Sequence, residues 1–90
     1  MNYIDSNNGK SMLTGIQIRA ARQSLRWTVS DIANSAKVSV STIKRIEACD
    51  GIPLVSVKNL LAVKVTLEAA GIEFIGSPED GPGIRVRPAR

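Results

Sequence analysis

The chain has 90 residues, of which 43% are hydrophobic and 22% are charged, and this balance is typical of one small globular domain. It has no His and one Cys, which excludes a Cys/His zinc site, a Ser-His-Asp triad, a Cys-His pair and an intrachain disulfide. The longest run without charge, Ser11 to Ile18, is shorter than the roughly 20 residues of a membrane span. With no export-type N-terminus, we expect a cytoplasmic protein without a cofactor or metal.

The positive charge of the chain is concentrated in one half. The segment from Lys10 to Arg45 holds seven Lys/Arg, and Asp31 is its one acidic residue. The remainder of the chain is close to neutral. This asymmetry is typical of a protein that meets a polyanion, with a merely solvated basic face as the alternative.

The first helix is expected at about 15–25, after a flexible polar tail over residues 1–12. Thr14 is a possible N-cap, and apolar residues recur at helical spacing along one face. Arg19, Arg22 and Arg26 are spaced i, i+3, i+7, which aligns three guanidinium groups on the other side. They are candidate contacts to an anion, or an exposed face that favours solubility.

Two short helices follow, joined by a three-residue break at 37–39. The first is expected at about 29–36, with Thr28 as N-cap and Asp31 completing a capping box. The second is expected at about 40–49, capped by Ser39. Small and apolar residues at the joint predict a close, rigid crossing of the two helices: Ile32, Ala33, Val38, Ile43 and Ile46.

A fourth helix is expected over 56–70. Gly51 is expected to close the third helix in a left-handed conformation, with Pro53 beyond it, and Gly71 ends the fourth. Apolar residues cover an arc of the fourth helix that is too wide for one contact face. This excess predicts a second buried contact, either a partner chain or the chain's own C-terminal tail.

The C-terminal tail contains two short β-favourable runs, 72–76 and 83–87, which predict a hairpin or two extended strands. Ile72 and Phe74 are expected on one face, and Ile84 and Val86 on another. A two-stranded ribbon is marginal alone, so it must lean on the helices or on a second subunit. The expected dimer interface joins the fourth helix and this ribbon: Val57, Leu61, Val65, Phe74, Ile84 and Val86.

The paired short helices resemble the helix-turn-helix domains of the Cro and phage-repressor type, also called Xre-like. The resemblance is carried by Ile18-Arg-Ala-Ala-Arg22, by Thr28 with Asp31-Ile32-Ala33, and by the run from Val38 to Glu47. It covers about 13–70, and the tail over 67–87 is similar to a small bacterial subgroup. The resemblance implies an all-α bundle of four main helices with a C-terminal β-hairpin over 71–90. It also implies a homodimeric regulator of transcription that binds double-stranded DNA and has no catalytic activity.

The resemblance also assigns roles to residues. Val40, Ser41, Lys44 and Arg45 are expected to read bases. Contacts to phosphates are expected from Arg22, Thr28 and Val29 by the resemblance. Arg19 and Lys37 are expected to contact phosphates because of their charge alone. Val29 and Val40 stand where polar residues are usual, and Lys37 stands where a left-handed Gly is usual. Readout is therefore expected to depend on Lys44, Arg45 and DNA shape.

Other interpretations stay open at this point. The protein could be an antitoxin or another interaction module that binds DNA together with a partner protein, which would co-purify with it. A small enzyme or a membrane-surface binder is less favoured. Cys49 is expected to fill the end of the third helix, with redox sensing as the alternative, and Trp27 is expected to anchor the core. The acidic residues Asp50, Glu79 and Asp80 are expected to be solvated.

Overall fold

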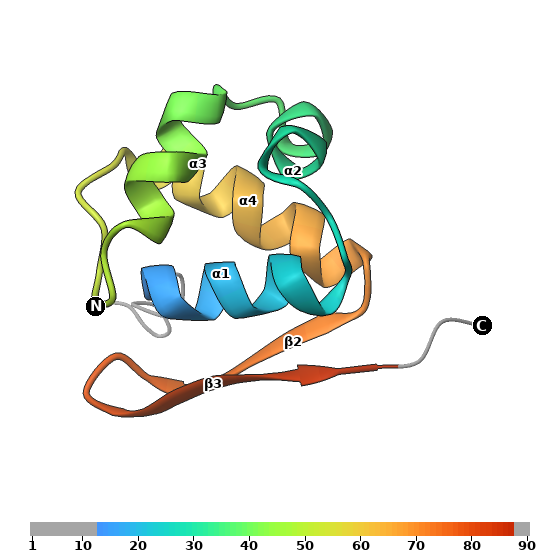
Figure 1. The fold of residues 1–90 in the computed structure, drawn as a ribbon. Helices are drawn as coiled ribbons and strands as arrows, with labels where there is room; N and C mark the ends of the chain where they lie inside the picture. Colours follow the sequence, from blue (N-terminus) through green and yellow to red (C-terminus); the bar gives the residue numbers. More distant parts are fainter. Residues whose placement is uncertain (1–12, 88–90) are drawn as a thin grey trace.

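The computed structural model describes residues 13–87, which form four helices followed by an antiparallel hairpin (Figure 1). The expected tail over 1–12 and the last three residues lie outside this range. Figure 1 shows α1 between the α2–α3 pair on one side and the hairpin on the other. The elements are α1 (Gly15–Ser24), α2 (Val29–Ala36), α3 (Val40–Glu47), α4 (Val57–Ala69), β2 (Ile72–Ser77) and β3 (Asp80–Val86).

Each helix begins at a hydroxyl cap, which confirms the expected starts. The side chains of Thr14, Thr28, Ser39 and Ser56 each accept a hydrogen bond from the backbone N–H three residues ahead. Thr14 and Thr28 belong to reciprocal capping boxes, and the expected box with Asp31 is one of them. A cap of this kind stabilises a helix by about 1 kcal/mol, so these short helices depend on them.

Helix ends differ from the expectation in two places. The third helix ends at Glu47, two residues earlier than expected, and Gly51 is not left-handed. The backbone of Arg26 has a φ of 60° just after α1, although nothing in the sequence around it marks such a turn. Gly71, with a φ of 104°, closes α4 as expected.

The core is aliphatic, as the scarcity of aromatic residues predicts. Its largest fully buried apolar side chains come from all four helices: Ile18, Ile32, Ile43, Ile46, Val63 and Leu67. Trp27 is half-buried and packs against this cluster, so its expected role as an anchor is confirmed. The buried side chains of the four helices therefore follow the predicted helical periodicity.

The hairpin rests on the chain's own helices. β3 packs against α1 and β2 against α4, and Phe74 and Ile84 contact the core. The expected assignment of two opposite faces is wrong. The register pairs Phe74 with Ile84 and Ile72 with Val86, and directly opposed residues of antiparallel strands share a face.

Gln17 is a buried polar link between α1 and the hairpin. Its Nε2 donates to the carbonyl oxygens of Ile75, at 3.1 Å, and Gly83, at 2.9 Å. Its Oε1 accepts from the backbone N–H of Thr14 at 3.0 Å. Gln17 is 3% exposed, and its bonds, which are buried or partly buried, anchor the strands to the start of α1.

The start of α1 also approaches the end of α3 backbone to backbone. A Cβ on Gly15 would lie 1.8 Å from the carbonyl oxygen of Cys49 and 2.1 Å from that of Ile46. The Gly15 N–H donates to the carbonyl of Gly51 at 2.8 Å. Only glycine fits this crossing.

Candidate nucleic-acid interface

The corner between α2 and α3 is rigid. Lys37 closes α2 in the left-handed region, with φ 59° and ψ 44°, and its backbone N–H donates to Ala33. This confirms the conformation expected at the position where glycine is usual. Ile32 of α2 and Ile43 of α3 are both fully buried beneath the turn. Because both helices are fixed by packing, the outer side of α3 is presented in one orientation.

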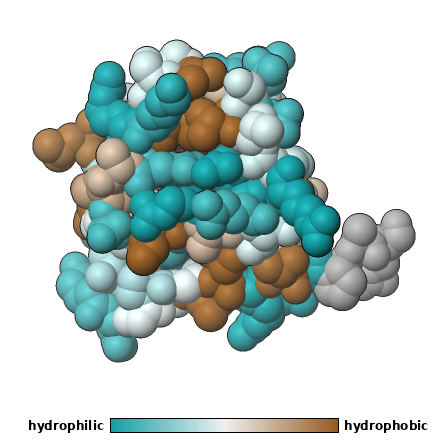
Figure 2. Space-filling view, in the orientation of Figure 1, coloured by the Kyte–Doolittle hydropathy of each residue, from teal (hydrophilic) through white to brown (hydrophobic). Residues whose placement is uncertain are grey.

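The outer side of α3 carries four neighbouring exposed residues, Val40, Ser41, Lys44 and Arg45, which form the candidate base-reading face. Thr42, by contrast, is buried, like Ile32 and Ile43. Val40 and Lys44, like Ser41 and Arg45, are one turn apart, so the four side chains are adjacent on the helix surface. The structure thus brings together all four residues expected to read bases. In Figure 2 the exposed surface around the α2–α3 corner mixes hydrophilic and hydrophobic groups.

The charge around this face is positive. Lys37, Lys44 and Arg45 are exposed, and Asp31 is the one acidic residue between Thr28 and Ile46. The next acidic residue, Glu47, is 9% exposed and its charge is matched inside the protein. An anion that approaches α3 therefore meets more positive than negative charge.

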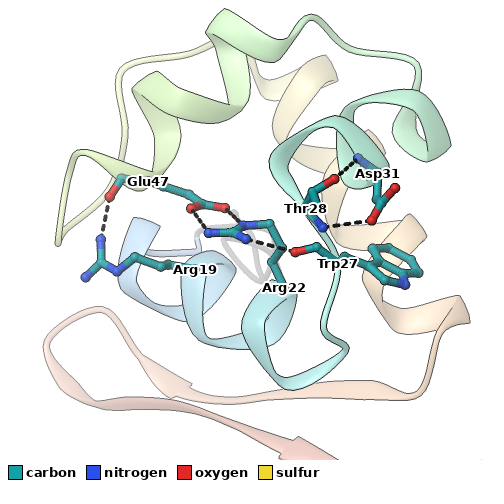
Figure 3. Close-up of polar contacts among 6 residues, drawn as sticks. All are labelled: Arg19, Arg22, Trp27, Thr28, Asp31 and Glu47. Atoms are coloured by element: carbon teal, nitrogen blue, oxygen red, sulfur yellow. Dashed lines mark hydrogen bonds and ion pairs between the residues drawn. The ribbon is translucent and has the colours of Figure 1, made fainter.

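Arg22 forms an ion pair with the buried carboxylate of Glu47. Its Nε and Nη2 donate to the two carboxylate oxygens of Glu47 at 2.7 Å and 2.9 Å, and its Nη1 donates to the carbonyl of Trp27 at 2.9 Å (Figure 3). The hydrogen bonds to Glu47 raise the pKa of Arg22 above its ordinary value. The Arg22 side chain is 15% exposed. Three of its five guanidinium N–H donors are bonded within the protein, where Arg22 joins α1 to α3, and its expected contact to a phosphate stays a prediction.

Arg19 braces the same end of α3. Its Nη1 donates to the carbonyl oxygen of Glu47 (Figure 3). Its Nη2 lies 3.1 Å from a carboxylate oxygen of Asp50. A cation beside the last carbonyls of a helix also complements the helix dipole. The three arginines expected to form one anion-binding stripe are thus divided, because two of them hold α3 and Arg26 lies exposed at the end of α1.

The start of α2 carries the remaining expected phosphate contacts. The backbone N–H of Thr28 donates to Asp31 at 2.8 Å, and the Thr28 hydroxyl accepts from the Asp31 N–H at 3.0 Å (Figure 3). Val29 is half-buried and packs against the core. In the capping box the Thr28 hydroxyl acts as an acceptor, so its proton is left for another contact. The Val29 N–H takes no part in the box. The Asp31 carboxylate opposes an anion at this point.

Sequence reasoning missed Glu47 as a structural residue. The available signal was its position: it follows Ile46 directly and is one turn from Ile43, so it borders the buried side of α3. An acidic residue there needs a cationic partner, and the basic side of the first helix supplies one. Cys49 is half-buried, with its thiol 3.6 Å from the carbonyl of Ile52, in keeping with the expected packing role.

Residues 13–87 contain no cluster of three or more His, Cys, Asp or Glu that could hold a metal ion. None of the four helices described is long and apolar enough to cross a membrane.

Residues 17–54 match a family model described as a helix-turn-helix domain. The match runs from α1 to the loop after α3, so it includes the α2–α3 corner, the candidate base-reading face and both braces of α3. Searches of curated proteins and of solved structures gave no match. The matched part, which is less than half of the chain, is therefore similar to a helix-turn-helix domain.

Proposed function

We propose that this protein is a sequence-specific transcriptional regulator of the Cro and phage-repressor (Xre-like) type, which binds operator DNA as a homodimer. The observation that carries the proposal is the face formed by Val40, Ser41, Lys44 and Arg45 on a helix that is capped at one end and braced at the other. No catalytic step is part of the proposal.

The dimensions and chemistry of α3 suit the major groove, which admits one α-helix. Lys44 and Arg45 are long enough to reach O6 and N7 of guanine, and each such contact discriminates against the wrong base by about 1–3 kcal/mol. Ser41 can bond several base edges, and Val40 can contact a thymine methyl group. Val40 is 38% exposed, so its side chain is available for this apolar contact.

The proposed phosphate contacts lie beside the base-reading face. Lys37 is exposed at the corner, where its charge is favourable to a phosphate. Thr28 can donate its hydroxyl proton, and Val29 its backbone N–H, at the start of α2. Arg22 and Arg19 are left out of the proposed contacts because both guanidinium groups are bonded to the end of α3. Their role is to fix the angle at which α3 projects.

The proposal is tested by selecting bound duplexes from a random pool and then titrating the selected duplex and a scrambled one at the same salt concentration. Lys44→Ala and Arg45→Ala should each lower the preference for the selected duplex by about 5- to 150-fold, with a smaller loss of affinity for scrambled DNA. Lys58→Ala, which removes an exposed charge from α4, is the matched control and should keep the preference. Equal losses on both duplexes would show that these side chains only neutralise phosphates.

A further inference from the structure

We propose that the first turn of α3 recognises 5-methylcytosine, so that methylation of a cytosine in the operator strengthens binding. This inference rests on the proposed DNA-binding function, and it assigns one kind of base pair to the base-reading face. It follows from the order of apolar, accepting and donating groups along that face, which a chain of hydroxyl groups at the start of α3 fixes.

Three hydroxyl groups at the start of α3 form this chain. The Ser39 Oγ donates its proton to the Oγ1 of Thr42 at 2.8 Å, and it accepts the backbone N–H of Thr42 at 3.0 Å. The Oγ of Ser41 lies 3.2 Å from the same Ser39 Oγ. Because a hydroxyl group has one proton, and that of Ser39 is given to Thr42, Ser41 is the donor in this contact. Ser41 therefore offers an outside partner its lone pairs and no proton.

The first turn of α3 has no side-chain donor left for DNA. Thr42 is buried and Ser39 is the N-cap of α3, so both partners of Ser41 in the chain belong to the folded framework. Val40, the first residue of α3, is exposed and has no polar atom in its side chain. This turn thus presents an apolar group at Val40 and a hydrogen-bond acceptor at Ser41.

The donors of the base-reading face lie one turn further on. Lys44 and Arg45 are exposed, and their side chains carry donors and no acceptor. At a rise of about 1.5 Å per residue, the face from Val40 to Arg45 extends about 7.5 Å along the helix axis, which is less than the roughly 12 Å width of the major groove. From the N-terminal end of α3, the order of groups on the face is apolar, acceptor, donors.

One base pair presents the complementary order. In the major groove, 5-methylcytosine paired with guanine shows the C5 methyl group, then the N4 amino donor, then the O6 and N7 acceptors of guanine. Thymine paired with adenine begins with the same methyl group, but its O4 acceptor comes next and would face the lone pairs of Ser41. Unmethylated cytosine has the matching hydrogen-bonding groups but leaves Val40 without its apolar contact. Methylated cytosine is therefore the base that satisfies both residues.

The two features of the base contribute different amounts to affinity. Taking one methyl group out of water against Val40 should strengthen binding by about fourfold per bound copy. Replacing the pair with thymine and adenine places acceptor against acceptor at Ser41, and one mismatched base pair lowers affinity by about 5- to 150-fold.

The test uses two random pools of duplexes, one made with cytosine and one with 5-methylcytosine in its place. The sequence that the wild-type protein enriches from the methylated pool is remade with cytosine, with a single 5-methylcytosine at each position in turn, and with thymine–adenine at each of these positions. All duplexes are titrated at the same salt concentration. At one position 5-methylcytosine should bind about fourfold more tightly than cytosine and about 5- to 150-fold more tightly than thymine.

Two variants assign these ratios to their residues. Val40→Ser should abolish the preference for 5-methylcytosine over cytosine, because no apolar group then covers the methyl group. Ser41→Ala should keep that preference and lose most of the discrimination against thymine. Val57→Ser, which replaces an exposed valine at the first position of α4, is the matched control and should keep both ratios.

The outcomes separate this inference from the proposed function. Equal affinity for methylated and unmethylated duplexes at every position would overturn the inference, and so would a methyl preference that survives in Val40→Ser. Tighter binding of thymine than of 5-methylcytosine would make thymine the source of the methyl group and would also overturn it. Each of these results leaves the proposed function standing, because a selected sequence is still preferred. Enrichment of no sequence from either pool would overturn the proposed function, and this inference with it.

Discussion

Replacing Arg22 distinguishes its observed role from the expected one. The guanidinium holds both oxygens of Glu47, and the two side chains are 15% and 9% exposed. Removing one partner of a buried pair leaves the other charge without compensation, at a cost of about 3–5 kcal/mol. The stability of a chain of 90 residues is about 5–13 kcal/mol. Arg22→Met should therefore remove a large part of it and lower Tm by roughly 12–40 °C.

The assay is urea unfolding followed by the fluorescence of Trp27, the single tryptophan. Arg22→Met and Glu47→Gln should each lower the free energy of unfolding, and the double variant should lose much less than the two losses together. The coupling should be at least about 2 kcal/mol for a bidentate pair of this burial. Lys64→Met, which breaks a surface i, i+4 pair with Glu68, is the matched control and should cost about 0.5 kcal/mol or less.

The DNA measurement completes this prediction. A residue that contacts a phosphate changes the slope of log K against log salt by about one unit when it is removed. Arg22→Met should leave that slope unchanged at a temperature where the variant is folded, because the guanidinium group is held by Glu47 and by the carbonyl of Trp27. Loss of about one slope unit with full retention of stability would refute the bracing role and restore the phosphate contact.

Three further outcomes follow from single positions. Gly15→Ala should destabilise the fold by at least about 2 kcal/mol in thermal unfolding, because its Cβ would collide with the carbonyl of Cys49, whereas Gly51→Ala meets nothing within 4 Å and should be tolerated. Lys37→Gly should raise the stability by up to about 1 kcal/mol by relieving the left-handed backbone, and lower non-specific DNA affinity; Lys37→Ala should lower the affinity without that gain. Hydrogen bonds from Arg85 and Arg87 hold the pKa of Glu73 below its ordinary value. The carboxylate therefore stabilises the fold above its unfolded-state pKa, and this stabilisation is lost as the pH falls through its folded-state pKa. Glu73→Gln should flatten the acid side of a plot of stability against pH.

The helices were predictable because their signals are local. Hydroxyl caps and periodic apolar residues mark each start within one residue, and the reading face follows from the burial of Ile43 and Ile46. The hairpin strands were predictable, but their register was not, because pairing depends on which residues the turn brings opposite each other. The left-handed backbone at Arg26 has no sequence signal, since neither glycine nor asparagine stands there.

The roles of charged residues were harder to predict than their positions. Arg19, Arg22 and Arg26 are spaced as expected, but a helical wheel does not show what packs against each of them. The end of α3 lies against α1, at a distance of 25 residues along the chain between Arg22 and Glu47. A pair this far apart in sequence is visible only in three dimensions. The sequence therefore identified a basic half without separating the cations that fold the protein from those that remain exposed.

This separation sets how strongly salt should weaken DNA binding. Six Lys/Arg lie between residues 13 and 45, and Arg19 and Arg22 are matched by carboxylates, which leaves Arg26, Lys37, Lys44 and Arg45 exposed for DNA. At about 0.9 slope units per phosphate neutralised, each bound copy should give a slope no steeper than about −3.6, against about −5.4 if all six cations took part. Titrations of a random duplex over a range of salt concentrations, with the number of bound copies counted by sedimentation, measure this value. A slope near −5.4 per copy would mean that the two guanidinium groups leave α3 for the DNA. The structure argues against that exchange, because it would uncover the Glu47 carboxylate beside a phosphate backbone of the same charge.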